Sequence, residues 1–157
     1  IIIIPLFVSC QDTMTAKTQN LFMASAGMGI YGFEYLGLGA SGTYLRNKNV
    51  FSLSAKSTSD WSYSYESIEF HFGRSLVNKK YLLFPITIGI GPTTISKIEF
   101  FGPTVFTKQE AFTVSGEAQL IFTPTKYFGI GVKGFSDITS FGINGGYFIS
   151  LYLGKLQ

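Results

Sequence analysis

A period of two runs through most of this chain and limits what it can fold into. Between residues 51 and 56, and again between 84 and 90, apolar side chains alternate with small or polar ones. Successive side chains of a strand point to opposite faces, so this alternation predicts β-strands with one apolar and one polar face. No segment carries the 3.6-residue period of a helix, and none approaches the ~20 consecutive apolar residues of a membrane-spanning helix.

Turn signals divide the alternating segments into eight strands. Short polar breaks such as Arg46–Asn49 and Thr123–Lys126 alternate with longer ones such as Pro92–Ala111. Neighbouring strands joined by short connections pair antiparallel, and an even number of them can close into an up-and-down barrel. The predicted strands span residues 21–29, 34–45, 50–58, 66–76, 81–91, 112–122, 127–136 and 141–154.

Composition indicates which face of these strands points outward. Apolar residues make up 46% of the chain and charged residues only 13%, against about 25% charged residues in ordinary soluble domains. With the apolar face inward, a soluble lipocalin-like barrel would expose mainly Gly, Ser and Thr and almost no charge. We therefore predict an all-β fold, an eight-stranded antiparallel up-and-down transmembrane β-barrel, because closed barrels satisfy every backbone group in lipid.

The segment from Leu21 to Gln157 resembles the small eight-stranded outer-membrane barrels of Gram-negative bacteria, the OmpA/OmpX-type class. Its last strand, from Phe141 onward, is also similar to the closing strand of uncharacterised bacterial barrel families that end in a Gly-Lys-Leu tail. The resemblance implies a place in the outer membrane, with both termini periplasmic. It also implies contact with outer-membrane lipid and, through extracellular loops, with other envelope proteins, and it implies no cofactor.

The first twenty residues are set apart from the predicted barrel, which spans residues 21–157. Residues 1–10 are apolar and have the character of a signal-peptide remnant, while residues 11–20 are polar and predict a periplasmic tether. Val8-Ser9-Cys10 resembles the end of a bacterial lipobox, which implies lipidation of Cys10. The alternative is a cysteine inside a signal sequence that a different peptidase cuts further on.

Four charged residues fall on the predicted polar face. Across two hairpins, Lys56 is expected opposite Glu69, and Glu117 opposite Lys133. Buried charges need partners, so the pattern predicts a lumenal ion-pair network that closes the barrel, with Ser115 and Gln119 nearby. The competing interpretation is an accidental spacing of surface charges.

Other charges and aromatic residues are expected at the two barrel ends. Asp137 is assigned to an outside loop, and aromatic girdles are expected to include Tyr31 and Tyr65 at the outer rim and Tyr152 at the periplasmic rim. Phe100 and Phe101 interrupt the long break with apolar side chains that could contact lipid headgroups or a partner. Extension of the neighbouring strands beyond the membrane is the alternative for this break.

The sequence offers little catalytic chemistry. His71, the only histidine, falls at mid-strand on the polar face, where a satisfied interior side chain is favoured over a catalytic one. One histidine and one cysteine predict no metal site, and twelve dispersed basic residues give no support for nucleic-acid binding. The prediction is a structural or interaction protein rather than an enzyme. A narrow channel, a rim-active lipid-modifying enzyme and a soluble ligand-binding barrel remain as alternatives.

Overall fold

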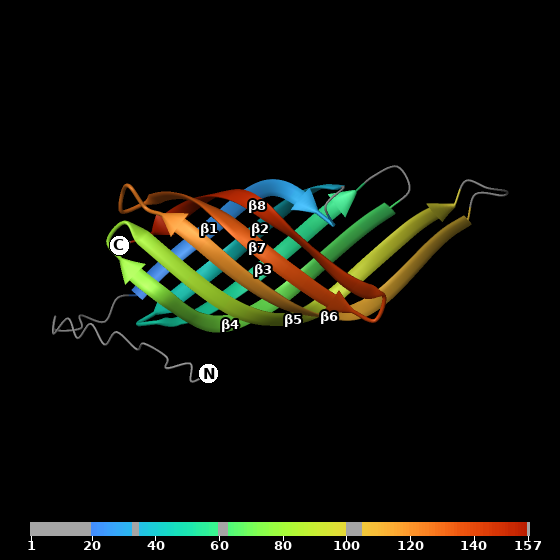
Figure 1. The fold of residues 1–157 in the computed structure, drawn as a ribbon, viewed down its shortest axis with the longest axis horizontal. Helices are drawn as coiled ribbons and strands as arrows, with labels where there is room; N and C mark the ends of the chain where they lie inside the picture. Colours follow the sequence, from blue (N-terminus) through green and yellow to red (C-terminus); the bar gives the residue numbers. More distant parts are fainter. Residues whose placement is uncertain (1–19, 33–34, 60–62, 100–104, 157) are drawn as a thin grey trace, which may run out of the picture.

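One antiparallel sheet closes on itself to form the whole described molecule. The computed structural model describes residues 20–32, 35–59, 63–99 and 105–156. Each strand pairs with the next, and β8 pairs back with β1, which closes the barrel (Figure 1). The strands are β1 (Asn20–Tyr31), β2 (Tyr35–Arg46), β3 (Asn49–Ser59), β4 (Tyr63–Lys79), β5 (Leu82–Glu99), β6 (Val105–Phe122), β7 (Phe128–Thr139) and β8 (Gly142–Lys155).

The predicted fold class is confirmed, and the strand bounds differ mainly in β4, β5 and β6. Most of the expected break at 92–111 is strand, because β5 and β6 stay paired from Pro92 with Phe112 to Glu99 with Val105. Figure 1 shows these two strands running past the others at one end. We call residues 93–99 and 105–111 the extended hairpin, the end that carries it the hairpin end, and the opposite end, where Asn20 and Lys155 lie, the terminal end. Phe100 and Phe101 lie outside the described residues.

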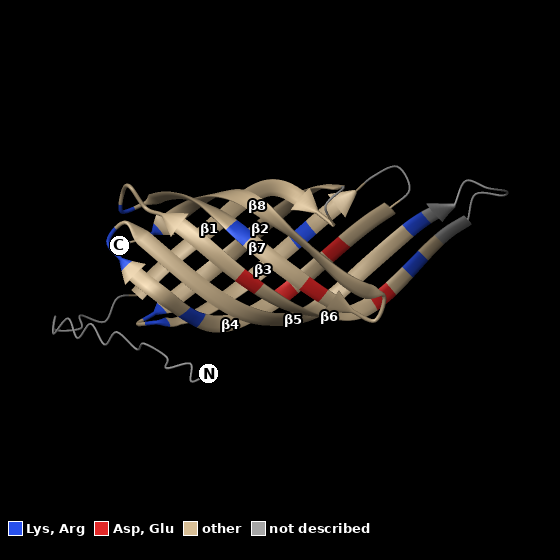
Figure 2. Ribbon diagram, in the orientation of Figure 1, with Lys and Arg blue, Asp and Glu red and all other residues tan. Residues whose placement is uncertain are grey.

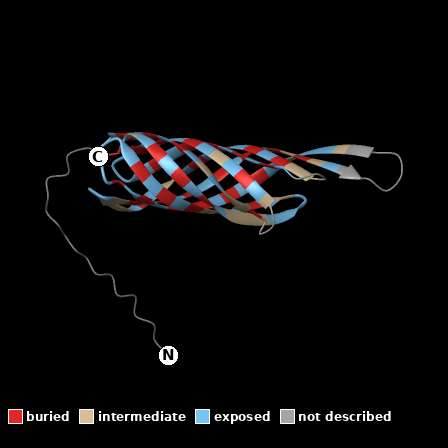
Figure 3. Cartoon of the chain, turned by 90° about the horizontal axis from the view of Figure 1, so that it is seen from above, coloured by how far each residue is buried: buried red, intermediate tan, exposed pale blue. Residues whose placement is uncertain are grey.

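Burial alternates along every strand and is inverted relative to a soluble protein. Phe70, Ile88 and Leu151 are 56%, 68% and 52% exposed on the outer face, whereas Lys56 and Glu117 are each 2% exposed inside. Figure 3 shows the resulting chequered pattern of buried and exposed positions around the barrel. An outer surface of this kind is poorly solvated by water and matches the hydrocarbon of a bilayer. The burial pattern contradicts the soluble lipocalin-like alternative.

Local sequence explains an irregularity in the ladder between β4 and β5. The register shifts between Ser75 and Val77, directly beside Pro85, which has no N–H to donate to a ladder hydrogen bond. Ser75 compensates locally, since its N–H donates to the Lys48 carbonyl at 2.7 Å and its hydroxyl donates to the Val77 carbonyl at 2.7 Å. The bulge thus accommodates a proline inside a continuous strand.

The two barrel ends differ in the length of their connections and in charge. At the terminal end, β2 and β3 join through Asn47 and Lys48, with Asn47 in the left-handed region at a φ of 59° that asparagine tolerates well. The short turns of this end carry most of the exposed basic side chains, namely Arg46, Lys48, Lys79, Lys80 and Lys126. Figure 2 shows lysine and arginine at these turns and acidic residues in the middle of the barrel and toward the hairpin end. Among the described residues, none forms a helix long and apolar enough to cross a membrane.

Candidate functional site

Lys56 is the centre of a buried group of charges inside the barrel. Its Nζ lies 2.7 Å from Asp137 Oδ1, 3.0 Å from Glu69 Oε2 and 3.7 Å from Glu117 Oε1. The ammonium group also lies 4.6 Å from the centroid of the Phe135 ring. One cation from β3 therefore joins carboxylates that arrive from β4, β6 and β7, which ties together strands that are not sheet neighbours.

A second lysine completes the group on the other side of Glu117. Lys133 Nζ lies 3.5 Å from Glu117 Oε2, and the Gln119 amide donates to the same oxygen at 3.3 Å. Tyr152 in turn donates its hydroxyl proton to Gln119 Oε1 at 3.3 Å. We call Lys56, Glu69, His71, Glu117, Lys133 and Asp137 the lumenal charge layer.

His71 lies inside this layer and is fully buried. Its Nε2 is 3.1 Å from Glu69 Oε2 and 2.9 Å from Ser54 Oγ, and Nδ1 is 3.4 Å from Thr87 Oγ1. Nε2 therefore faces a hydroxyl and a carboxylate oxygen, while Nδ1 faces a second hydroxyl. The imidazole is packed against Gly89, where an added Cβ would lie 2.5 Å from the ring. This geometry holds His71 as a structural bridge and gives a lipid substrate no route to the ring.

Three of these side chains could offer ligand atoms to a metal ion, a grouping that the sequence analysis missed. Glu69, His71 and Glu117 place one donor atom each within 4.8 Å of one another. The separation of Glu117 from the other two along the chain concealed the grouping, because only the closed barrel brings inward-facing side chains of β4 and β6 together across the intervening strand β5. Lys56 Nζ already lies against both carboxylates, so an ammonium group serves here as the cation.

All four residues of the expected ion-pair network lie in the lumenal charge layer, but the pairs are diagonal rather than directly opposite. Lys56 faces Ser67, two positions from Glu69, and Lys133 faces Gln119, two positions from Glu117. Long side chains span this diagonal separation.

Asp137 was assigned to an outside loop, and that assignment is wrong. It is fully buried and provides the shortest contact to Lys56. The strand β7 continues to Thr139, so position 137 shares the inward face of Lys133 and Phe135. Asp137 lies one residue beyond the predicted end of the strand at 136, in step with Lys133 and Phe135.

Apolar clusters lie on both sides of the charge layer inside the barrel. The hairpin-end cluster contains stacked and tilted aromatic rings, with Tyr31 and Tyr65 at 4.6 Å and Phe135 and Phe148 at 5.0 Å between centroids. It consists of Tyr31, Tyr65, Ile95, Phe135 and Phe148. The terminal-end cluster consists of Leu21, Met23, Leu45, Val50, Leu83, Ile121, Tyr152 and Leu156.

These clusters correct the expected aromatic girdles. Tyr31, Tyr65 and Tyr152 point into the barrel and are almost completely buried. Tyr31 and Tyr65 donate hydrogen bonds to Asp137 Oδ2 at 3.3 and 3.1 Å, so their hydroxyl groups extend the charge layer. Gly37 and Gly39 leave room for the large Phe148 ring, which lies 3.2–3.3 Å from where their Cβ atoms would be.

Two further predictions concern residues outside the part of the chain that the structure describes. Cys10, with the proposed signal remnant 1–10 and most of the tether 11–20, lies outside the described residues, as do Phe100 and Phe101. Neither the lipidation nor the lipid or partner contact is tested by the geometry above.

Known structures share this architecture at low sequence identity. Neisserial surface protein A aligns with a TM-score of 0.66 and 9% identity, over 85% of this chain and 96% of that one. The N-terminal β-barrel domain of Pseudomonas aeruginosa OprF aligns with a TM-score of 0.62 and 15% identity, over 88% and 99% of the two chains. No protein-family model and no curated relative matches the chain.

A third neighbour is Ail, the attachment invasion locus protein of Yersinia pestis, in complex with the heparin analogue sucrose octasulfate. It aligns with a TM-score of 0.60 and 12% identity, over 87% of this chain and 97% of that one. Together with the inverted burial, these alignments define the class of the protein: an eight-stranded transmembrane β-barrel with the fold of small outer-membrane proteins.

Proposed function

We propose that the chain is an outer-membrane protein whose barrel acts as a sealed membrane scaffold with a structural or interaction role. The closed lumen carries this proposal. The lumenal charge layer fills the middle of the barrel, and an apolar cluster lies on each side of it. Eight-stranded barrels are narrow enough for side chains to fill, so a continuous wet path, which a narrow channel would need, has no support.

The extended hairpin supports an interaction role. On the β7 side, β6 pairs only from Val114 to Phe122, so among the described residues the stretch from Val105 to Thr113 has an unpaired backbone edge. Its outer face carries exposed Lys108 and Glu110, which pair with each other at 3.2 Å. An exposed strand edge that extends past the barrel is suited to contacts with another protein. Ail, a neighbour with this fold, is named the attachment invasion locus protein, and that name supports the proposal.

We also propose an orientation from the features of the two ends. We place the termini and the short basic turns in the periplasm and the extended hairpin outside the cell, in line with the short periplasmic turns and longer outer loops of such barrels. Lipidation of Cys10 would attach the tether on the periplasmic side. Metabolic labelling with a fatty acid tests this part, since a Cys10→Ser variant should lose a label that the parent protein carries.

Reconstitution into planar bilayers tests the sealed lumen. The folded protein, verified by a gel mobility that changes only after boiling, should give conductance equal to that of protein-free membranes. Reproducible single-channel steps would contradict the proposal.

Photo-crosslinking in cells tests the interaction role. A photoreactive amino acid at Gln109 on the extended hairpin should form adducts with another envelope component or an external partner, whereas the same group at Asn47 in a terminal-end turn should not. The absence of adducts at Gln109 and at neighbouring hairpin positions would argue against a role in interaction. Unchanged outer-membrane lipids after His71→Ala would exclude the alternative of a lipid-modifying enzyme.

A further inference from the structure

A groove of about 490 Å³ runs across the outer face of β1, β2, β3 and β4. Its floor consists of Ala26, Ala40 and Ala55, which lie directly beside one another on three neighbouring strands. Elsewhere the outer face carries bulky side chains such as Phe70, Ile88 and Leu151. The three adjacent alanines therefore leave a depression between larger apolar side chains such as Leu38 and Ile68.

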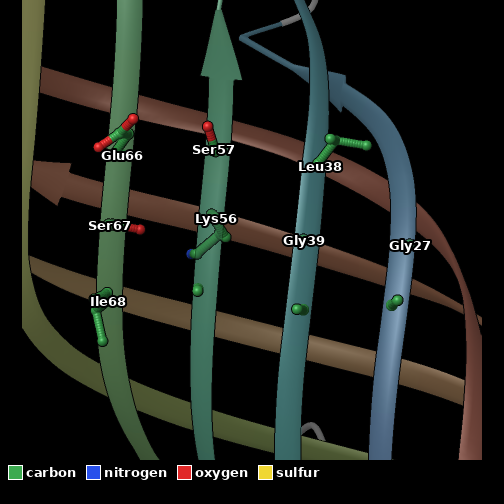
Figure 4. A pocket seen from close by; sticks show the side chains of 11 residues that line it. Gly27, Leu38, Gly39, Lys56, Ser57, Glu66, Ser67 and Ile68 are labelled. Atoms are coloured by element: carbon green, nitrogen blue, oxygen red, sulfur yellow. The ribbon is translucent and has the colours of Figure 1, made fainter.

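The walls and mouth of the groove have different chemistry. Leu38 on β2 and Ile68 on β4 form apolar walls, while Ser57 on β3 and Glu66 on β4 bring a hydroxyl and a carboxylate to one end. Ser57 pairs directly with Glu66 across the two strands. Figure 4 shows Glu66, Ser57 and Leu38 in one row across three strands, with Ile68 further along β4. The groove is thus apolar along its length and polar at one end.

Glu66 lies at the height of the bilayer where lipid headgroups begin. On the outer face of β4, the apolar run Ile68, Phe70 and Phe72 is bounded by Glu66 at one end and Arg74 at the other. Eight residues at about 3.4 Å each, tilted by about 40°, separate the two charges by roughly 21 Å along the membrane normal. That separation is close to the apolar band of about 25 Å in such barrels.

The carboxylate of Glu66 is available for a ligand. The side chain is exposed, and no cation among the described residues lies within ion-pair distance of it. The other exposed acidic group whose side chain is described, Glu110, already has Lys108 at 3.2 Å. An unpaired carboxylate at headgroup level attracts a positive headgroup, and an ammonium group can also donate charge-assisted hydrogen bonds to it.

We propose that this groove is a binding site for one lipid with an ammonium headgroup. An acyl chain lies over Ala26, Ala40 and Ala55 between the walls of Leu38 and Ile68, and the ammonium group binds Glu66 with Ser57 beside it. The volume falls within the range of about 300–1,000 Å³ that is usual for small-molecule sites. The inference rests on the proposed function only in that the outer face must contact lipid.

Native mass spectrometry of the full chain tests the headgroup. After exchange into mixed micelles with equal phosphatidylethanolamine and phosphatidylglycerol, the protein should retain one phosphatidylethanolamine in preference. Glu66→Gln should lower this retention about tenfold, the effect of losing one charge-assisted hydrogen bond. Glu110→Gln, which removes the exposed carboxylate that is already paired, should retain the lipid like the parent. Equal retention of both lipids, or no effect of Glu66→Gln, would overturn the proposal.

A second pair of variants tests the groove itself. Ala40→Leu places a large side chain on the floor and should abolish lipid retention, whereas Ala118→Leu changes an outward-facing alanine of β6 that does not line the groove and should leave it intact. If the Ala40→Leu variant still retained the lipid, the lipid would not occupy the groove. The same conclusion would follow if the parent protein formed a dimer that only Ala40→Leu disrupted. Both variants should keep heat-modifiable mobility and zero conductance, so a failure here is distinct from a failure of the sealed-scaffold proposal.

Discussion

At the scale of single residues, Lys56 decides whether the lumenal charges are tolerated. The lumenal charge layer has three carboxylates, from Glu69, Glu117 and Asp137, and Lys56 lies within 3.7 Å of all of them. Charges removed from water are stable only when they are paired and hydrogen-bonded. Lys133 contacts only Glu117 among these carboxylates, so it cannot replace Lys56 at the other two.

Replacement of Lys56 by methionine should therefore destabilise the folded barrel strongly. The expected loss is about 3–5 kcal/mol, the cost of leaving a buried charge without its partner. Urea unfolding in lipid vesicles, followed by tryptophan fluorescence, measures the change. Lys97→Met, at an exposed position of the extended hairpin, should change stability by no more than about 0.5 kcal/mol. Equal stability of both variants would show that the ion pairs do not hold the barrel together.

Much of the lumenal charge layer could be predicted because every second residue of a strand lies on the same face of the sheet. Lys56, Glu69, His71, Glu117 and Lys133 share positions with small or polar neighbours inside clearly alternating strands, so their inward direction follows from sequence. Asp137 was missed because the predicted strand ended at 136. Tyr31, Tyr65 and Tyr152 were missed for another reason: aromatic side chains suit both a lipid interface and a packed lumen, and their chemistry alone does not distinguish the two.

At the scale of elements, β4 and β5 lie close together where Gly91 precedes Pro92. The paired positions skip from Ser67 with Thr93 to Phe70 with Ile90, and a Cβ on Gly91 would lie well inside contact distance of the Ile68 carbonyl oxygen. A side chain at position 91 would therefore force the backbone of β4 to move.

Gly91→Ala should thus destabilise the barrel. Replacement of glycine by alanine ordinarily adds stability, because alanine restricts the conformations of the unfolded chain. The expected loss exceeds about 1 kcal/mol, since the backbone of β4 must move. Gly116→Ala is the matched control, because a Cβ at that outward-facing strand position meets nothing within 4 Å. The unfolding midpoint of each variant in vesicles measures the difference, and a gain in stability for Gly91→Ala would refute the close-approach explanation.

Shortening of the extended hairpin should leave the barrel folded. Ile95 pairs with Gln109, so an Asn-Gly turn can join these two residues in place of 96–108. The strand pairing of β5 with β6 from Ile86 to Thr94 remains, and these contacts close the barrel wall. Heat-modifiable mobility should persist in the shortened protein. Loss of the folded form would indicate that the hairpin is part of the barrel's folding unit.

The ends of the elements were harder to predict than their existence. Within the apolar band, alternation of large apolar and small polar side chains gives a clear period of two, and the strand centres follow from it. Beyond the apolar band, both faces of β5 and β6 contact water or each other. The alternation of apolar and polar residues is therefore weaker there, and Thr, Ser and Lys are common. The backbone pairing nevertheless continues to Glu99 and Val105.

At the scale of the whole molecule, the fold inverts the usual relation of apolar and polar faces. An arginine in the middle of the outer apolar run should then be costly in a bilayer. Ile88→Arg is expected to lose about 2–4 kcal/mol, whereas Tyr81→Arg, in a terminal-end turn, should lose about 0–1 kcal/mol. Vesicle unfolding titrations compare the two, and similar costs at both positions would be incompatible with a membrane centred on Ile88.

The sealed lumen was only partly predictable at this scale. Small residues and ion pairs on the inner face indicated a filled barrel, but the apolar clusters on either side of the charge layer depend on how the tilted strands stagger around the wall. Leu21, Leu45 and Ile121 meet because three turns, the start of β1 and the end of β8 converge at one end. Such convergence is a property of the closed sheet rather than of any single strand.

Methyl NMR of the unmodified protein in lipid nanodiscs that contain a paramagnetic lipid tests the two-faced barrel most directly. The isoleucine methyl signals of Ile88, Ile90 and Ile149, on the outer face, should be broadened strongly by the spin label in the acyl chains. The methyl signal of Ile121, which is buried in the terminal-end cluster, should keep its intensity. Equal broadening of all four, or protection of Ile88 with loss of Ile121, would contradict the account.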